Sequence, residues 1–83
     1  MKKLIQHNIP EERHELTKLI RLDMFEMKRA RTTYIINFFE GRLYGLIAAY
    51  QKLGIIDMRA RSKYIEIIAS AAYKRKEELA YEI

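Results

Sequence analysis

His7, Glu11 and His14 are the best-spaced group of potentially reactive side chains in this sequence. If a helix begins early enough, all three fall on one face, and Glu11-x-x-His14 matches half of the carboxylate–histidine motif of di-iron helical bundles. That motif needs a second such pair and two further glutamates in the bundle core. The sequence offers one pair at a helix end, so we expect no metal site.

Nucleophilic and cofactor chemistry have less support. The chain has no cysteine, which excludes disulfides and thiolate metal sites. Ser62 and Ser70 are the only serines, and neither lies in a catalytic motif. No glycine-rich phosphate loop is present either. We therefore expect a non-enzymatic protein without a cofactor.

Positive charge is concentrated in the middle of the chain, whose net charge is +5. Residues 28–63 contain two acidic residues, Glu40 and Asp57. The same segment contains eight basic residues: Lys28, Arg29, Arg31, Arg42, Lys52, Arg59, Arg61 and Lys63. Such asymmetry favours an anionic partner, with nucleic acid first, and an ordinary solvated helix surface is the alternative.

The sharpest nucleic-acid candidates are Arg59, Arg61, Ser62 and Lys63, which follow a predicted corner at residues 53–57. In a helix-turn-helix, the first turns after the corner enter the major groove of DNA. Arg59 or Arg61 would then make bidentate contacts to guanine, with Ser62 and Lys63 nearer phosphate. These residue types predict a DNA-binding face.

Further basic residues could contact the nucleic-acid backbone. Arg42 and the cluster of Lys28, Arg29 and Arg31 would supply affinity without reading sequence. The corner itself departs from the helix-turn-helix pattern, because Tyr50 stands four residues before the turn glycine, where a small residue is usual. Any role in binding therefore rests on the basic side chains and not on the corner.

Three predicted helices, at residues 9–30, 33–53 and 57–80, would position these side chains. They belong to a single domain of residues 1–83 with an N-terminal arm at 1–8. The sequence thus predicts an all-α fold, a small three-helix domain with a helix–glycine corner–helix unit that is compatible with a dimer.

Capping residues mark the ends of these helices. Asn8 can cap the first helix, and a break near Arg31–Thr33 precedes the second, although one long bent helix is the alternative. Gly54 can adopt the left-handed conformation that ends the second helix, with Ile55 making the accompanying apolar contact. Asp57 is a good N-cap for the third.

Apolar residues at helical spacing give each predicted helix an inner face. The three faces are Leu16, Leu19, Ile20, Met27 and Ala30; Ile36, Phe39, Leu43, Ile47, Tyr50 and Leu53; and Met58, Ile65, Ile68, Ala69, Ala72 and Leu79. Asp23 lies within the first stripe, so its carboxylate should meet an arginine, a tyrosine hydroxyl or water, and Arg42 is a candidate partner.

Two further features indicate interfaces. Leu22 and Phe25 project away from the inner face of the first helix, which indicates a second contact surface. Gly41 and Gly45 form a small-xxx-small step, which predicts a close crossing with a neighbouring helix or, alternatively, a homodimer contact.

The sequence shows neither a signal-peptide core nor an apolar run approaching the ~20 residues of a membrane span. We therefore expect a cytoplasmic protein without a membrane partner. The leading hypothesis is a nucleic-acid-binding regulator or accessory protein that uses a basic helical face. The alternative is a protein–protein interaction module, an adaptor or inhibitor with an acidic partner, that uses apolar groups such as Leu22 and Phe25.

Overall fold

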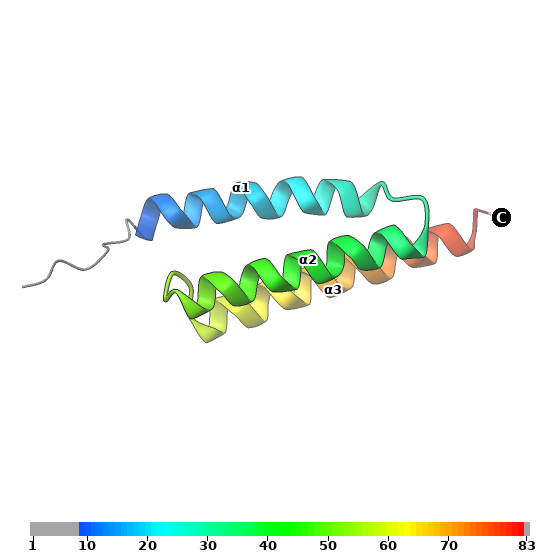
Figure 1. Cartoon of the computed structure of the whole chain (residues 1–83). Coiled ribbons are helices and arrows are strands. Elements are labelled where there is room, and N and C mark those ends of the chain that lie inside the picture. Colours follow the sequence, from blue (N-terminus) through cyan, green and yellow to red (C-terminus); the bar gives the residue numbers. More distant parts are fainter. Residues whose placement is uncertain (1–8, 83) are drawn as a thin grey trace, which may run out of the picture.

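The computed structural model describes residues 9–82, and these form three helices and no strand. The helices are α1 (Ile9–Lys28), α2 (Thr33–Lys52) and α3 (Met58–Ala80). They run up, down and up, so α1 and α3 are parallel and α2 is antiparallel to both (Figure 1). α2 contacts each neighbour more extensively than α1 contacts α3. The predicted all-α three-helix fold is confirmed, while the arm at 1–8 and the predicted cap Asn8 lie outside the described residues.

The core lies where the apolar faces of the three helices meet. Its largest fully buried side chains are Leu16, Met27, Ile36, Leu43, Ile47, Ile55 and Ile68. Burying one such aliphatic side chain contributes about 1.5–3 kcal/mol relative to leaving it exposed. These contacts are the main source of stability in a chain without disulfides.

The predicted inner faces are wrong at three positions, because Leu53, Met58 and Ala69 are exposed. Leu53 is the C-cap of α2, and Met58 is the first residue of α3. Both therefore lie at the end of the bundle where α2 turns into α3, outside the packed core. Ala69 directly follows the buried Ile68, and one residue turns a helix by about 100°, which carries its methyl out of the core.

The chain breaks between α1 and α2, as the capping pattern favours. α1 ends at Lys28, two residues before its predicted end. Thr32 has an extended backbone (φ −137°, ψ 153°), and its hydroxyl accepts a 3.1 Å hydrogen bond from the Ile35 N–H. The hydroxyl satisfies a free N–H of the first turn of α2, so the threonine pair starts a helix although threonine favours strands.

The corner between α2 and α3 follows the predicted chemistry. Gly54 has a φ of 81°, and its N–H donates to the oxygen of Gln51 at 3.0 Å. The N–H of the buried Ile55 donates to the oxygen of Tyr50 at 3.0 Å, which completes a Schellman cap. The Asp57 carboxylate then accepts from the Ala60 N–H at 2.8 Å and starts α3.

Each of the two interhelical loops accepts a hydrogen bond from the helix that it does not connect. Arg13 of α1 donates through Nε to the oxygen of Ile55, in the loop between α2 and α3, at 3.0 Å. Arg75 of α3 donates through Nε to the oxygen of Ala30, in the loop between α1 and α2, at 2.8 Å. These two bonds hold α1 beside α3 at both ends of the bundle.

Gly41 and Gly45 do not bring another helix close, so the predicted close crossing within the chain is wrong. Both glycines are exposed, and a Cβ added to either would meet no atom within 4 Å beyond its own surroundings. They lie on the outer face of α2 with the half-exposed Phe38.

Within residues 9–82, none of the helices combines the length and the apolar composition that spanning a lipid bilayer requires.

Candidate functional site

Most basic residues of the middle segment lie near one end of the bundle or the other, and Arg42 lies between them on α2. Lys28, Arg29 and Arg31 lie where α1 ends and α2 begins. Arg59 and Lys63 lie in the first turns of α3, at the opposite end of the bundle (Figure 1). The 20-residue α2 separates these ends by about 30 Å at 1.5 Å per residue.

Several of these basic side chains also have partners within the chain. Arg61 donates through Nη1 to Oε1 of Gln51 at 3.0 Å, which links α3 to α2. The Arg29 guanidinium lies 5.2 Å from the centre of the Phe25 ring and 3.9 Å from a Glu26 oxygen. The guanidinium groups of Arg61 and Arg29 therefore already have partners within the chain. The side chain of Ser62 is exposed to solvent.

Arg42 forms the predicted pair with Asp23, which is confirmed. Its Nε donates to Oδ2 of Asp23 at 2.8 Å. The aspartate is 9% exposed and belongs to the packed face of α1. Arg42 therefore neutralises a buried carboxylate between α1 and α2, although its own side chain remains largely exposed.

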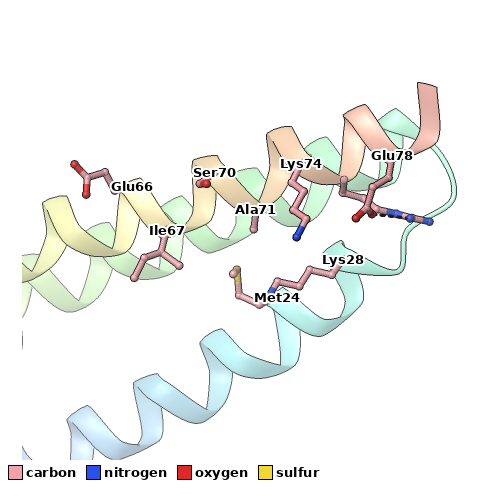
Figure 2. A pocket seen from close by; sticks show the side chains of 9 residues that line it. Met24, Lys28, Glu66, Ile67, Ser70, Ala71, Lys74 and Glu78 are labelled. Carbon is pink, nitrogen blue, oxygen red and sulfur yellow. Dashed lines mark hydrogen bonds and ion pairs between the residues drawn. The ribbon is translucent and has the colours of Figure 1, made fainter. Parts of the chain in front are cut away.

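A large hollow of the described surface lies between α1 and α3. It measures about 660 Å³ and is lined by Met24 and Lys28 from α1 and by Ile67, Ala71 and Lys74, among others, from α3. Figure 2 shows Ile67, Ala71 and Lys74 pointing from α3 towards α1. An open trough thus exists where the two parallel helices contact each other least.

Two neighbouring hollows extend this trough. One, of about 380 Å³, shares Met24, Lys28 and Ile67 with the first and adds Phe25. Another, of about 310 Å³, shares Ile67 and Tyr64 with the second. The three hollows form one surface, here called the α1–α3 groove, whose floor consists of Ile20, Met24, Phe25, Ala60, Tyr64, Ile67 and Ala71.

Two large apolar side chains of the groove are exposed to solvent. Phe25 is 59% exposed and Ile67 is 52% exposed, one from each wall. Phe25 was expected to form a second contact surface with Leu22. Leu22 is 63% exposed, but it does not line the groove. The structure therefore groups Phe25 with Ile67 and Tyr64 of α3.

Five cations line the groove: Arg21, Lys28, Lys63, Lys74 and Arg75. Within residues 9–82, Arg75 pairs with Glu78 and Glu82, whereas the other four cations make no ion pair. Two carboxylates also line the groove: Glu78, which pairs with Arg75, and Glu66, whose side chain points away from α1 (Figure 2). The groove is thus an apolar trough with a positive rim.

A separate polar cluster joins α2 to α3 outside the groove. The Tyr44 hydroxyl donates to Oε2 of Glu40 at 2.7 Å, and the Lys76 ammonium lies 3.9 Å from the other oxygen of Glu40. Burial, followed by the hydrogen bond and the negative charge of Glu40, raises the pKa of Tyr44 to about 12. This phenol stays protonated at neutral pH and acts as a hydrogen-bond donor.

In the part of the chain that the structure describes, no side chains are arranged as a metal site. No three side chains of His, Cys, Asp or Glu within residues 9–82 could together hold a metal ion. His14 is exposed on α1, and His7 lies outside the described residues.

The groove was missed at the sequence level, although a signal for it exists. Ala60, Tyr64, Ile67 and Ala71 recur at steps of four and three, which makes a second apolar stripe beside the inner face of α3.

No protein-family model matches the chain, and the comparisons with curated proteins and with solved structures gave no significant match.

Proposed function

We propose that the protein is a non-enzymatic protein-interaction module that receives its partner in the α1–α3 groove. The observation that carries this proposal is the pair of exposed apolar side chains on opposite walls, Phe25 and Ile67. Apolar side chains left in water along a continuous trough gain free energy when a partner covers them, at roughly 25 cal/mol per Å² of apolar surface.

The distribution of charge supports a protein partner over a nucleic acid. A duplex is contacted mainly at its phosphates, by polar and basic groups. The floor of the groove is apolar, and two of the basic residues of 28–63, Arg42 and Arg61, are already bonded to Asp23 and Gln51. An apolar centre with a charged rim is the usual anatomy of a protein–protein interface.

Site-specific photo-crosslinking in cells that naturally make the protein tests this proposal. A benzophenone amino acid is placed at Phe25 or Ile67, with Phe38 on the outer face of α2 as the control, because it is exposed to a similar degree (53%). We expect discrete protein adducts from positions 25 and 67 and none of the same size from position 38. Adducts absent from the groove positions, or equal at all three, would overturn the proposal.

Nucleic-acid binding is the second candidate, favoured by Arg59 and Lys63. Both are exposed and make no ion pair within the described residues, and the first turn of α3 contains no acidic residue. The Asp57 carboxylate already caps the N-terminus of α3, so phosphate contacts would come from the side chains of Arg59 and Lys63.

A fluorescence-anisotropy titration with a 20-base-pair duplex separates this candidate from the first. Binding should weaken steeply between 50 and 200 mM salt and should be lost in Arg59→Ala/Lys63→Ala. Lys18→Ala, an exposed position on α1, is the matched control and should bind like the wild type. An absence of binding at 50 mM salt would remove the candidate.

A further inference from the structure

We propose that the partner segment in the α1–α3 groove is an amphipathic helix with acidic flanks, a proposal that rests on the protein-interaction function proposed above. Three features of the groove identify this occupant: its length, the nature of its walls and the charge of its rim. Each restricts the chemistry of the partner in a different way.

The groove has the length of a helical segment. The α3 wall runs from Ala60 to Glu78, and its 18 residue-to-residue steps correspond to about 27 Å at 1.5 Å per residue. An occupant helix of about five turns would cover this length and would present apolar side chains at i, i+3, i+4 and i+7 to the floor. Ridges from such a helix would fill the space between two parallel helices as in a bundle.

The walls favour a helix over an extended strand. Both walls are α-helices, whose main-chain groups are bonded within each helix, and the described residues contain no sheet edge. A β-strand occupant depends on main-chain hydrogen bonds to an edge strand, which the described residues do not offer. A helix brings its main-chain bonds with it, so apolar side chains alone can bind it.

The rim requires negative charge on the occupant. Lys28 and Lys74 point into the same end of the groove from different helices, and the Glu78 carboxylate at this end is already paired with Arg75 (Figure 2). Arg21 and Lys63 lie nearer the middle and the other end of the groove. The carboxylates of Glu40, Glu78 and Glu82 pair with Arg75 or Lys76 and with none of these four cations. The cations of the rim are thus left for carboxylates of another molecule, which would also set the orientation of that molecule.

The same charge argues against a second copy of this chain as the occupant. Two copies related by a twofold axis would bring identical rims together, and each rim carries four unpaired cations. Like charges facing each other across an interface cost several kcal/mol. An acidic helix from another protein meets no such repulsion.

Designed peptides test the chemistry directly on the full-length protein. The probe is an 18-residue helical peptide with leucines at i, i+3, i+4 and i+7 spacing and glutamates on both flanks. One control peptide replaces every glutamate by lysine, and another shuffles the acidic sequence to remove the apolar stripe. In fluorescence anisotropy we expect the acidic helix to bind at least tenfold more tightly than either control.

Protein variants assign the binding to the groove. Ile67→Asp should weaken binding of the acidic peptide at least tenfold, while Ile35→Asp, on α2, should leave it unchanged. Lys28→Glu/Lys74→Glu should reverse the preference in favour of the lysine peptide. Equal binding of the acidic and shuffled peptides, or an unaffected Ile67→Asp, would overturn the proposal. A dimer of the wild type that Ile67→Asp dissociates in sedimentation would assign the groove to a second copy and overturn it too.

The peptide result and the crosslinking result remain distinguishable. Crosslinks from positions 25 and 67, with no preference for the acidic peptide, would reject the acidic helix and leave the protein-interaction function standing. An absence of crosslinks from both groove positions would reject both.

Discussion

Arg75 Nε donates a 2.8 Å hydrogen bond to the main-chain oxygen of Ala30, a residue 45 positions earlier in the chain. The Arg75 side chain is only 13% exposed, and its Nη1 also lies 3.0 Å from Glu78 and 3.5 Å from Glu82. A guanidinium can hold all three at once because its donors point in fixed, different directions. This residue therefore sets the distance between the end of α1 and α3, and with it the width of the groove at that end.

Arg75→Met should destabilise the protein by about 2–3 kcal/mol, since it removes charge-assisted hydrogen bonds and leaves a main-chain oxygen unpaired. The midpoint of urea unfolding, followed by circular dichroism, measures the loss. Lys74→Met is the matched control on the adjacent, exposed residue, and its effect should stay within about 0.5 kcal/mol. Equal losses in both variants would contradict a specific role for the bond to Ala30.

The Asp23–Arg42 pair should behave as a unit. Arg42→Met leaves the aspartate carboxylate, 9% exposed, without its cation and should cost about 1–3 kcal/mol. Adding Asp23→Leu should recover most of that loss, because an apolar side chain suits this packed position better than an unpaired charge. A double-mutant cycle of unfolding free energies measures the coupling. Strictly additive losses would mean that the pair contributes little.

Local chemistry made the corner of the fold predictable. Gly54 and Asp57 act within four residues of themselves, through the left-handed backbone of one and the side-chain cap of the other. The periodicity of α2 placed Ile36, Leu43 and Ile47 in the core for a similar reason. Two of the three wrongly predicted core positions, Leu53 and Met58, lie at helix ends, where periodicity does not say how far the neighbouring helix extends.

The candidate site was less predictable because it depends on how α1 sits against α3. Lys28 and Lys74 are 46 positions apart in the sequence and line one hollow, a pairing that the charge of residues 28–63 does not indicate. Two apolar stripes on α3 could each have been the inner one. Only the packing of α1, held by Arg13 and Arg75, determines which stripe stays open.

Tyr44 predicts a specific loss of stability at high pH. Its pKa is about 12 in the folded protein and 10.0 without these neighbours, so the folded state holds the proton more tightly. The stabilisation is present below pH 10 and disappears as the pH rises towards 12. Tyr44→Phe should be less stable by about 1 kcal/mol at pH 7, and this gap should narrow at pH 11. The urea midpoints of the wild type and of Tyr44→Phe, measured at each pH, test this. The other tyrosines and the lysines titrate in both proteins, so their effects cancel in the comparison. A difference in stability that stays constant between pH 7 and pH 11 would contradict the prediction.

Substitutions of Gly41 and Gly45 should have opposite effects on stability in a monomer and in the homodimer that the sequence suggests. In the single chain both are exposed helical glycines with open space around them, so each Gly→Ala change should stabilise α2 by about 1 kcal/mol. Gly54→Ala is the contrasting control, because its φ of 81° makes alanine unfavourable there and the variant should be destabilised.

A dimer closed through this face would reverse the sign of the effect. The closest approach of two α2 helices would occur at the glycines, so Gly41→Leu should convert a dimer to a monomer and lower its thermal midpoint in a concentration-dependent way. Sedimentation velocity of the wild type and of Gly41→Leu between about 10 and 500 µM distinguishes the cases. A monomeric wild type with stabilised alanine variants rejects the dimer contact. A dimer that Gly41→Leu dissociates would instead account for two glycines in the middle of a helix, each of which costs about 1 kcal/mol.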